Sequence, residues 1–183
     1  MAEDSWRIRG LATRWNVPIS GGAIGGKPML RPQIFRPGAF RRCLQNGVLV
    51  DLLLEHQGGP RGENITDSDS GLFIDETAEG LVFSAWANDT IFAKRAVLGI
   101  IGGTLRECSI AWRSEEQRCE NGCDVISVAT LLDITIARRG ACPGTRLEIL
   151  SPRQLEAERQ AKRNLFRKDC YGNRTMGHSS VMV

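Results

Sequence analysis

The feature that most constrains the fold is a pair of apolar, strand-like segments joined by an Asn-Gly turn. The two segments are Leu105–Trp112 and Val125–Ala137, and each has the period of two that is typical of half-buried strands. Between them, Cys119 and Cys123 enclose the tripeptide Glu-Asn-Gly, and an Asn-Gly pair is the strongest short signal for a tight hairpin turn. The sequence therefore predicts an antiparallel hairpin within a fold built mainly on β-strands.

The rest of the chain predicts more short strands, separated by helices and Gly-rich loops. The further strands are expected at Trp6–Trp15, Val48–Leu54, Leu72–Ile74 and Leu81–Trp86, and loops at Val17–Pro32 and Gln57–Gly71. One short helix should follow Arg36 and end at Gly47. A second should be capped by Asn88 or Asp89, end at Gly99, and bury Ile91, Phe92, Ala96 and Leu98. This pattern predicts a mainly β fold with helices, an antiparallel β-barrel surrounded by short helices.

Length and composition predict one globular domain followed by a tail. The chain has 183 residues, of which 42% are hydrophobic and 25% charged, which suffices for a single core without disulfides or metal. The character changes at Ser151, because Ser151-Pro152-Arg153-Gln154 forms a capping box with proline at the first helical position. We expect a main domain at residues 1–150 and a basic helical tail at 151–183, its helix reaching about Lys168.

Composition also disfavours several classes of function. The net charge of +3 is small and dispersed, so nucleic-acid binding is not indicated, and no apolar run approaches the length of a membrane span. The segment Met1–Trp6 lacks the basic and apolar regions of a secretory signal, which predicts an intracellular protein with reduced thiols. Although Cys119 and Cys123 approach metal-knuckle spacing, no second Cys/His pair lies at zinc-finger spacing, so we expect neither a metal nor a cofactor.

Three residues on separate strands have the side chains that nucleophilic catalysis requires. Ser109 should lie opposite an apolar face formed by Cys108, Ile110 and Trp112. Asp133 is the one acid in its strand, whose expected apolar stripe is Ile126, Val128, Leu132, Ile134 and Ile136. His56 follows the strand Val48–Leu54, and together the three supply a hydroxyl, an imidazole and a carboxylate. By residue type alone, the simpler interpretation is a strand hydroxyl, a loop-entry histidine and a structural acid.

Several segments together resemble the prohead (capsid maturation) protease family of tailed phages, which is related to the herpesvirus assembly proteases (assemblins). The order histidine, serine, acid is also that of the family. The resemblance covers about residues 6–150, and its segments are Ile8–Ala12, Arg36–Phe40, Leu53–His56, Asp69–Leu72, Cys108–Trp112 and Asp133–Ile136.

The resemblance implies an assemblin-like barrel and a serine endopeptidase with a Ser-His-Asp triad. In this scheme Ser109 attacks the peptide carbonyl, His56 carries the proton and Asp133 orients His56. By analogy with an arginine pair in the herpesvirus relatives, Arg138 and Arg139 are implied to stabilise the oxyanion. The sequence departs from the family at Gln57, at Asp133 in place of the commoner Glu, and at Cys108 and Ala111 beside the serine, but no catalytic atom is lost.

The resemblance also implies substrates and a location. The protease would cleave scaffold or major capsid protein segments, and itself, in the host bacterium's cytoplasm inside the assembling procapsid. A homo-oligomer is expected, and no membrane partner.

Three alternatives stay open from the residues. The first is an inactive barrel that binds scaffold, and the second is catalysis by the Cys108 thiol. The third is a nucleic-acid contact through residues 151–170, which hold six Lys/Arg against three Asp/Glu.

Overall fold

The protein is mostly β-structure with few helices, as the sequence predicts. The computed structural model describes residues 6–20, 23–24, 27–55, 64–87, 90–158 and 160. Its strands are β1 (Arg7–Arg14), β2 (Ala23–Ile24), β3 (Lys27–Pro28), β4 (Gln33–Phe35), β5 (Asp51–Leu54), β6 (Asn64–Asp67), β7 (Leu72–Glu76), β8 (Gly80–Trp86), β9 (Glu107–Glu120), β10 (Cys123–Ala137) and β11 (Arg146–Leu150). Its helices are α1 (Arg41–Gln45) and α2 (Ile91–Ile101).

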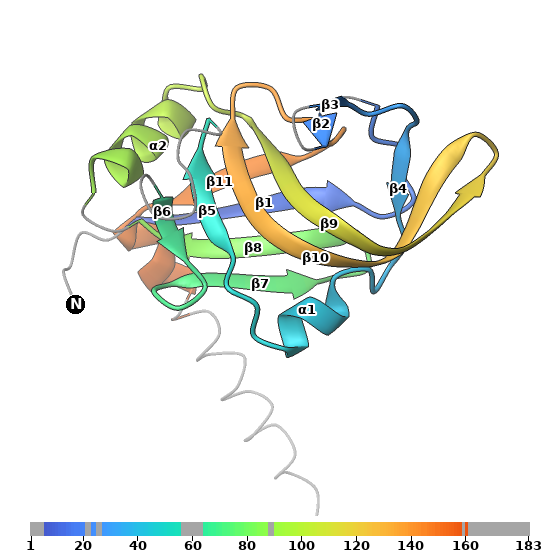
Figure 1. Ribbon diagram of the computed structural model, residues 1–183. Coiled ribbons are helices and arrows are strands. Elements are labelled where there is room, and N and C mark those ends of the chain that lie inside the picture. The colour runs from blue at the N-terminus through green and yellow to red at the C-terminus, as the bar shows by residue number, and fades with distance from the viewer. Residues whose placement is uncertain are drawn as a thin grey trace, which may run out of the picture.

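The strands form two main sheets that lie against each other (Figure 1). The first has the order β11-β1-β8-β7 and is antiparallel. The second has the order β4-β10-β5-β6, with β9 paired antiparallel to β10, while β4 and β5 run parallel to β10. Strands β2 and β3 form a separate small ribbon. Among the described residues these ladders do not close into one barrel, so barrel closure stays a prediction.

The core lies between the two sheets, because each sheet directs one set of alternating side chains toward the other. Sheet one contributes Ile8, Ala12, Leu81, Phe83 and Ala85, and sheet two contributes Leu52, Leu54, Cys108, Ile110, Ile134 and Ile136. Beside them, the ring of Phe40 lies 4.9 Å from that of Phe35, which in turn lies 5.0 Å from that of Trp112. Phe40 of the Arg36–Phe40 signature is thus connected through Phe35 to Trp112, on the strand that carries Ser109.

The predicted β9–β10 hairpin is confirmed, but β-bulges alter one predicted face. Its turn residues Asn121 and Gly122 have φ values of 49° and 78°, which a type I′ turn requires and which Asn and Gly tolerate best. Irregular register between Ile126 and Asp133 shifts the inward positions of β10. As a result Leu131 is buried, whereas Leu132 is 44% exposed, so the predicted stripe is wrong at Leu132.

The helices differ from the predictions at their ends and faces. Residues Pro37–Phe40 form a turn, so α1 begins only at Arg41. The N-cap of α2 is Thr90, whose hydroxyl accepts the N–H of Ala93, and the predicted caps Asn88 and Asp89 lie outside the described residues. This helix continues past Gly99 to Ile101 and buries Ala93, Ala96 and Val97, while the predicted core residues Ile91 and Leu98 are exposed.

Two predicted loops contain strands. The Asp- and Ser-rich stretch includes β6, which pairs with β5, and the first loop includes the β2–β3 ribbon. Of the stretch Gln57–Gly71, residues 57–63 lie outside the described residues.

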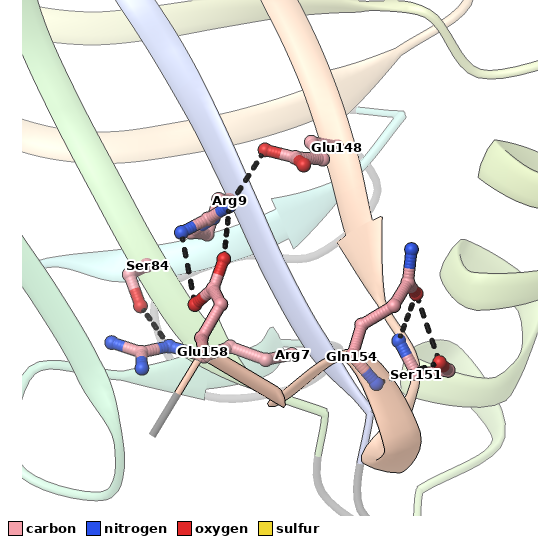
Figure 2. Close-up of polar contacts among 7 residues, drawn as sticks. All are labelled: Arg7, Arg9, Ser84, Glu148, Ser151, Gln154 and Glu158. Carbon is pink, nitrogen blue, oxygen red and sulfur yellow. Dashed lines mark hydrogen bonds and ion pairs between the residues drawn. The ribbon is translucent and has the colours of Figure 1, made fainter. Parts of the chain in front are cut away.

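The predicted capping box begins a helical segment at residues 152–158 and 160. The Gln154 N–H donates to the Ser151 hydroxyl, and the Ser151 N–H donates to Gln154 Oε1 at 2.9 Å. Figure 2 shows this box and an ion pair that holds the segment to β1, in which Glu158 Oε1 lies 3.1 Å from Arg9 Nη2. Leu155 is buried, so the segment packs on the main domain. The predicted continuation to Lys168 lies outside the described residues. None of the described helices is both long and apolar enough to cross a membrane.

Candidate active site

Ser109 lies in a row of buried side chains on the face of sheet two that points away from the core. In the register, Ser109 pairs with Thr135 on β10, and Thr135 pairs with Leu53 on β5. Their neighbours along each strand, Cys108, Ile136 and Leu54, belong to the core, so the row occupies the opposite face. Ser109 is 4% exposed, so the residue as a whole is buried.

Asp133 shares this face and is a diagonal neighbour of Ser109. It pairs with Ala111 on β9, two residues beyond Ser109, and with Asp51 on β5. Diagonal neighbours on one sheet face are separated by roughly 7–8 Å, a gap that an intervening imidazole can bridge. The Thr135 hydroxyl donates to Asp133 Oδ1 at 3.0 Å, so the residue opposite the serine also fixes one oxygen of the acid.

His56 lies outside the described residues, but the structure describes Glu55, the residue before it. Glu55, the preceding residue, follows β5 and donates its N–H to the carbonyl of Ile136 at 2.9 Å. Its φ of 55° breaks the strand alternation, so the face of the next side chain does not follow from the pattern of β5. Glu55, the residue before His56, is therefore hydrogen-bonded to Ile136, one position along β10 from Thr135.

The predicted arginine pair lies in a loop that touches the Ser109 strand. Gly140 packs so closely on the backbone that a Cβ there would lie 1.9 Å from the Cys108 carbonyl oxygen. The Gly140 N–H donates to Glu107 Oε2 at 2.8 Å, and the Arg138 N–H donates to Glu55 Oε1 at 2.9 Å. The structure thus brings this loop against the residue that precedes Ser109.

Sequence reasoning missed three contributors: Thr135, Glu55 and Gly140. Gly140 had a signal, because a glycine directly after a strand and a charged pair indicates a close backbone approach. Thr135 and Glu55 had no local signal, since their roles depend on pairing between distant strands.

The thiols near the site are poor nucleophiles. Cys108 is fully buried on the core face, and this burial, with the neighbouring Cys142 and Glu107, raises the pKa of its thiol far above the ordinary value. Burial likewise raises the pKa of Cys142 to about 11. A reactive cysteine needs the opposite, a lowered pKa, so the structure disfavours catalysis by Cys108.

The chemistry of this region is that of hydroxyl and carboxylate groups. In the part of the chain that the structure describes, no group of three or more His, Cys, Asp or Glu is arranged as metal ligands. The arrangement joins a strand serine, a diagonal carboxylate and a loop of backbone N–H groups, which are the parts that acyl transfer uses.

Comparison with known proteins identifies a family and finds distant structural likenesses. Residues 2–161 match the family model Peptidase S78, described as the caudovirus prohead serine protease. No curated protein matches the chain. Among solved structures, the KSHV protease in complex with a hexapeptide phosphonate inhibitor is 9% identical, with a TM-score of 0.46 over 96% of this chain and 80% of that chain. At that identity and score, the likeness carries no argument about chemistry.

Proposed function

Because this chain belongs to the caudovirus prohead serine protease family, we propose that it is the endopeptidase of procapsid maturation, with Ser109, His56 and Asp133 as its triad. Its substrates are scaffold segments or extensions of the major capsid protein, and its own chain. The observation that carries the proposal is the register that sets Ser109 opposite Thr135 and diagonal to Asp133.

Each member of the triad has one task. The Ser109 hydroxyl attacks the scissile carbonyl while His56 takes its proton and later gives it to the leaving amine. Asp133 holds the imidazole in one tautomer and stabilises its charged form. The hydrogen bond from Thr135 supports this role, because it restrains one oxygen of the acid beside Ser109.

The backbone of the Arg138–Gly140 loop stabilises the oxyanion. A tetrahedral intermediate on Ser109 places negative charge near its own strand, and the loop packs on the backbone of Cys108, one residue away, so that a backbone N–H of the loop can donate to it. Arg138 and Arg139 are exposed, so their guanidinium groups add positive charge to the surface of this loop.

Burial of Ser109 fits a protease that stays silent until it is enclosed. A peptide cannot reach Ser109, a residue that is 4% exposed, unless the residues around it move. Packing with coat, scaffold or a second copy of the chain inside the procapsid would supply that rearrangement, and would confine cleavage to the assembling particle.

The test is co-expression of this chain with its coat or scaffold partner, followed by intact mass measurement of the products. Ser109→Ala should abolish processing, since loss of a triad nucleophile lowers kcat by on the order of 10⁶. His56→Ala should be equally damaging, whereas His178→Ala serves as the control and should process normally. Undiminished processing by Ser109→Ala would refute the triad, and a wild-type chain that binds its partner without cleaving it would favour the inactive barrel.

A further inference from the structure

Two glutamates, Glu55 just after β5 and Glu107 on β9, hold one loop beside the proposed nucleophile. Glu55 directly precedes His56, and Glu107 lies two residues before Ser109 on β9. Glu55 Oε1 accepts the N–H of Arg138 at 2.9 Å, and Glu107 Oε2 accepts the N–H of Gly140 at 2.8 Å. The loop is therefore hydrogen-bonded both to the residue before His56 and to β9, the strand that carries Ser109.

The conformation of Glu55 indicates that its side chain matters at this position. Its φ of 55° is disfavoured for a residue with a Cβ, and a position that needed only the turn would suit glycine or asparagine. Here both ends of the residue are restrained, since its N–H donates to the Ile136 carbonyl and its carboxylate binds the loop. The Arg138 guanidinium also lies near the same carboxylate, with Nε 3.7 Å from Oε1.

The loop is fixed from its other side by backbone packing. Gly140 lies so near the Cys108 carbonyl that no larger residue fits, and Glu107 restrains the Gly140 N–H. Both N–H groups that flank Arg139 thus have carboxylate partners. The N–H of Arg139 itself has no hydrogen-bond partner among the described residues, which makes it the available donor of the three.

We infer that Glu55 and Glu107 are positioning residues that hold the loop so that the Arg139 N–H, rather than that of Arg138, serves the oxyanion. This inference rests on the proposed function. Neither glutamate touches substrate: each acts through a backbone N–H of the loop. Because an amide oxygen accepts such a bond as a carboxylate does, glutamine should replace either residue, whereas alanine should not.

Glutamine separates this role from that of a triad acid. An acid that orients and stabilises a charged imidazole must be ionised, so its amide variant fails. A residue that only accepts a backbone hydrogen bond keeps its function as glutamine. The comparison of Gln with Ala at each position therefore reports which role the glutamate has.

The experiment measures the rate at which a fluorophosphonate labels Ser109 in the chain co-expressed with its coat partner, with the adduct located by mass. The phosphoryl oxygen of this probe occupies the oxyanion position, so the limiting labelling rate reports the donor. Glu107→Ala and Glu55→Ala should lower that rate by about 10²-fold, the effect of losing or misplacing one donor, with the half-saturating probe concentration unchanged. Glu107→Gln and Glu55→Gln should stay within about threefold of wild type, by the same reasoning on retained acceptors.

Glu116→Ala is the matched control, because it removes an exposed glutamate from the same strand, nine residues and roughly 30 Å farther along. The Glu55 side chain is 33% exposed, so Glu55→Ala should still fold. Its labelling rate can therefore be measured even if Glu107→Ala unfolds. Alanine variants that label as fast as Glu116→Ala would overturn the inference and leave the protease intact. Glutamine variants that are labelled as slowly as the alanine variants would also overturn the inference, because they would show that the position needs an ionised carboxylate. A wild-type chain unlabelled at Ser109 would instead overturn the proposed function.

Discussion

Gly140→Ala should destabilise the protein, because there is no room for a methyl group between the Arg138–Gly140 loop and β9. The added Cβ would lie 1.9 Å from the Cys108 carbonyl oxygen and 2.7 Å from its carbonyl carbon, both backbone atoms. Real Cβ contacts are essentially never below 3.0 Å, so the loop must retreat by about 1.1 Å. A shift of that size would stretch the 2.8 Å bond from Gly140 to Glu107 beyond hydrogen-bond range.

The expected loss follows from that bond and the accompanying strain. A hydrogen bond to a charged group contributes about 1.5–3 kcal/mol, and overpacking adds about 1–3 kcal/mol, so we expect a loss of about 3–5 kcal/mol in the free energy of unfolding. For a chain of this length the melting temperature should fall by roughly 6–20 °C. Urea unfolding and thermal melting, both followed by circular dichroism, measure the two quantities.

Gly122→Ala is the control, since its Cβ would meet no atom within 4 Å and only its φ of 78° opposes substitution. That variant should lose about 1–2 kcal/mol. If Gly140→Ala is no less stable than Gly122→Ala, the loop does not press on the serine strand, and the argument for its place beside Ser109 fails.

Three further outcomes are expected. Asp133→Asn should lower kcat by on the order of 10⁴ in the coat-processing assay, because the amide favours the wrong histidine tautomer, whereas Glu107→Gln should cost far less; the reverse ranking would make Glu107 the triad acid. Alkylation of the exposed Cys119 by iodoacetamide, mapped by mass, should leave coat processing unchanged. Loss of processing after alkylation would support catalysis by a thiol. Limited proteolysis should leave a stable core, whose predicted end is Leu150. Because the helical segment after Leu150 packs on the main domain, a chain that ends at Gln160 should melt several degrees higher than one that ends at Leu150.

Local chemistry made the hairpin and the faces of β9 predictable. Asn121 and Gly122 encode their turn by tolerating positive φ, and strict alternation placed Ile110 in the core. The β10 stripe failed because bulges depend on the partner strand: with Leu131 and Leu132 adjacent, nothing local decides which one points inward. The strand at Asn64–Asp67 was missed for a similar reason, since its polar sequence pairs only because β5 lies beside it.

The candidate site divides in the same way. Residue types and the family resemblance selected Ser109 and Asp133, but only the register could make them diagonal neighbours around Thr135. Strand alternation predicts that Glu55 and its neighbour point to opposite faces, but that rule holds only within a strand and fails at a residue with a φ of 55°. Contacts between distant segments determine such details.

The pairing of β9 bears on how the protein avoids aggregation. Among the described residues β9 forms its ladder only with β10, and Figure 1 shows the hairpin extending past the other strands. Such an edge offers unpaired backbone groups to any strand of a neighbouring molecule. The far half of β9 carries mixed charges, with Arg113, Glu115, Glu116, Arg118 and Glu120. Pairing this segment with a strand of a neighbouring molecule would bring those charges close together, so the mixed charges oppose edge-to-edge association of the hairpin.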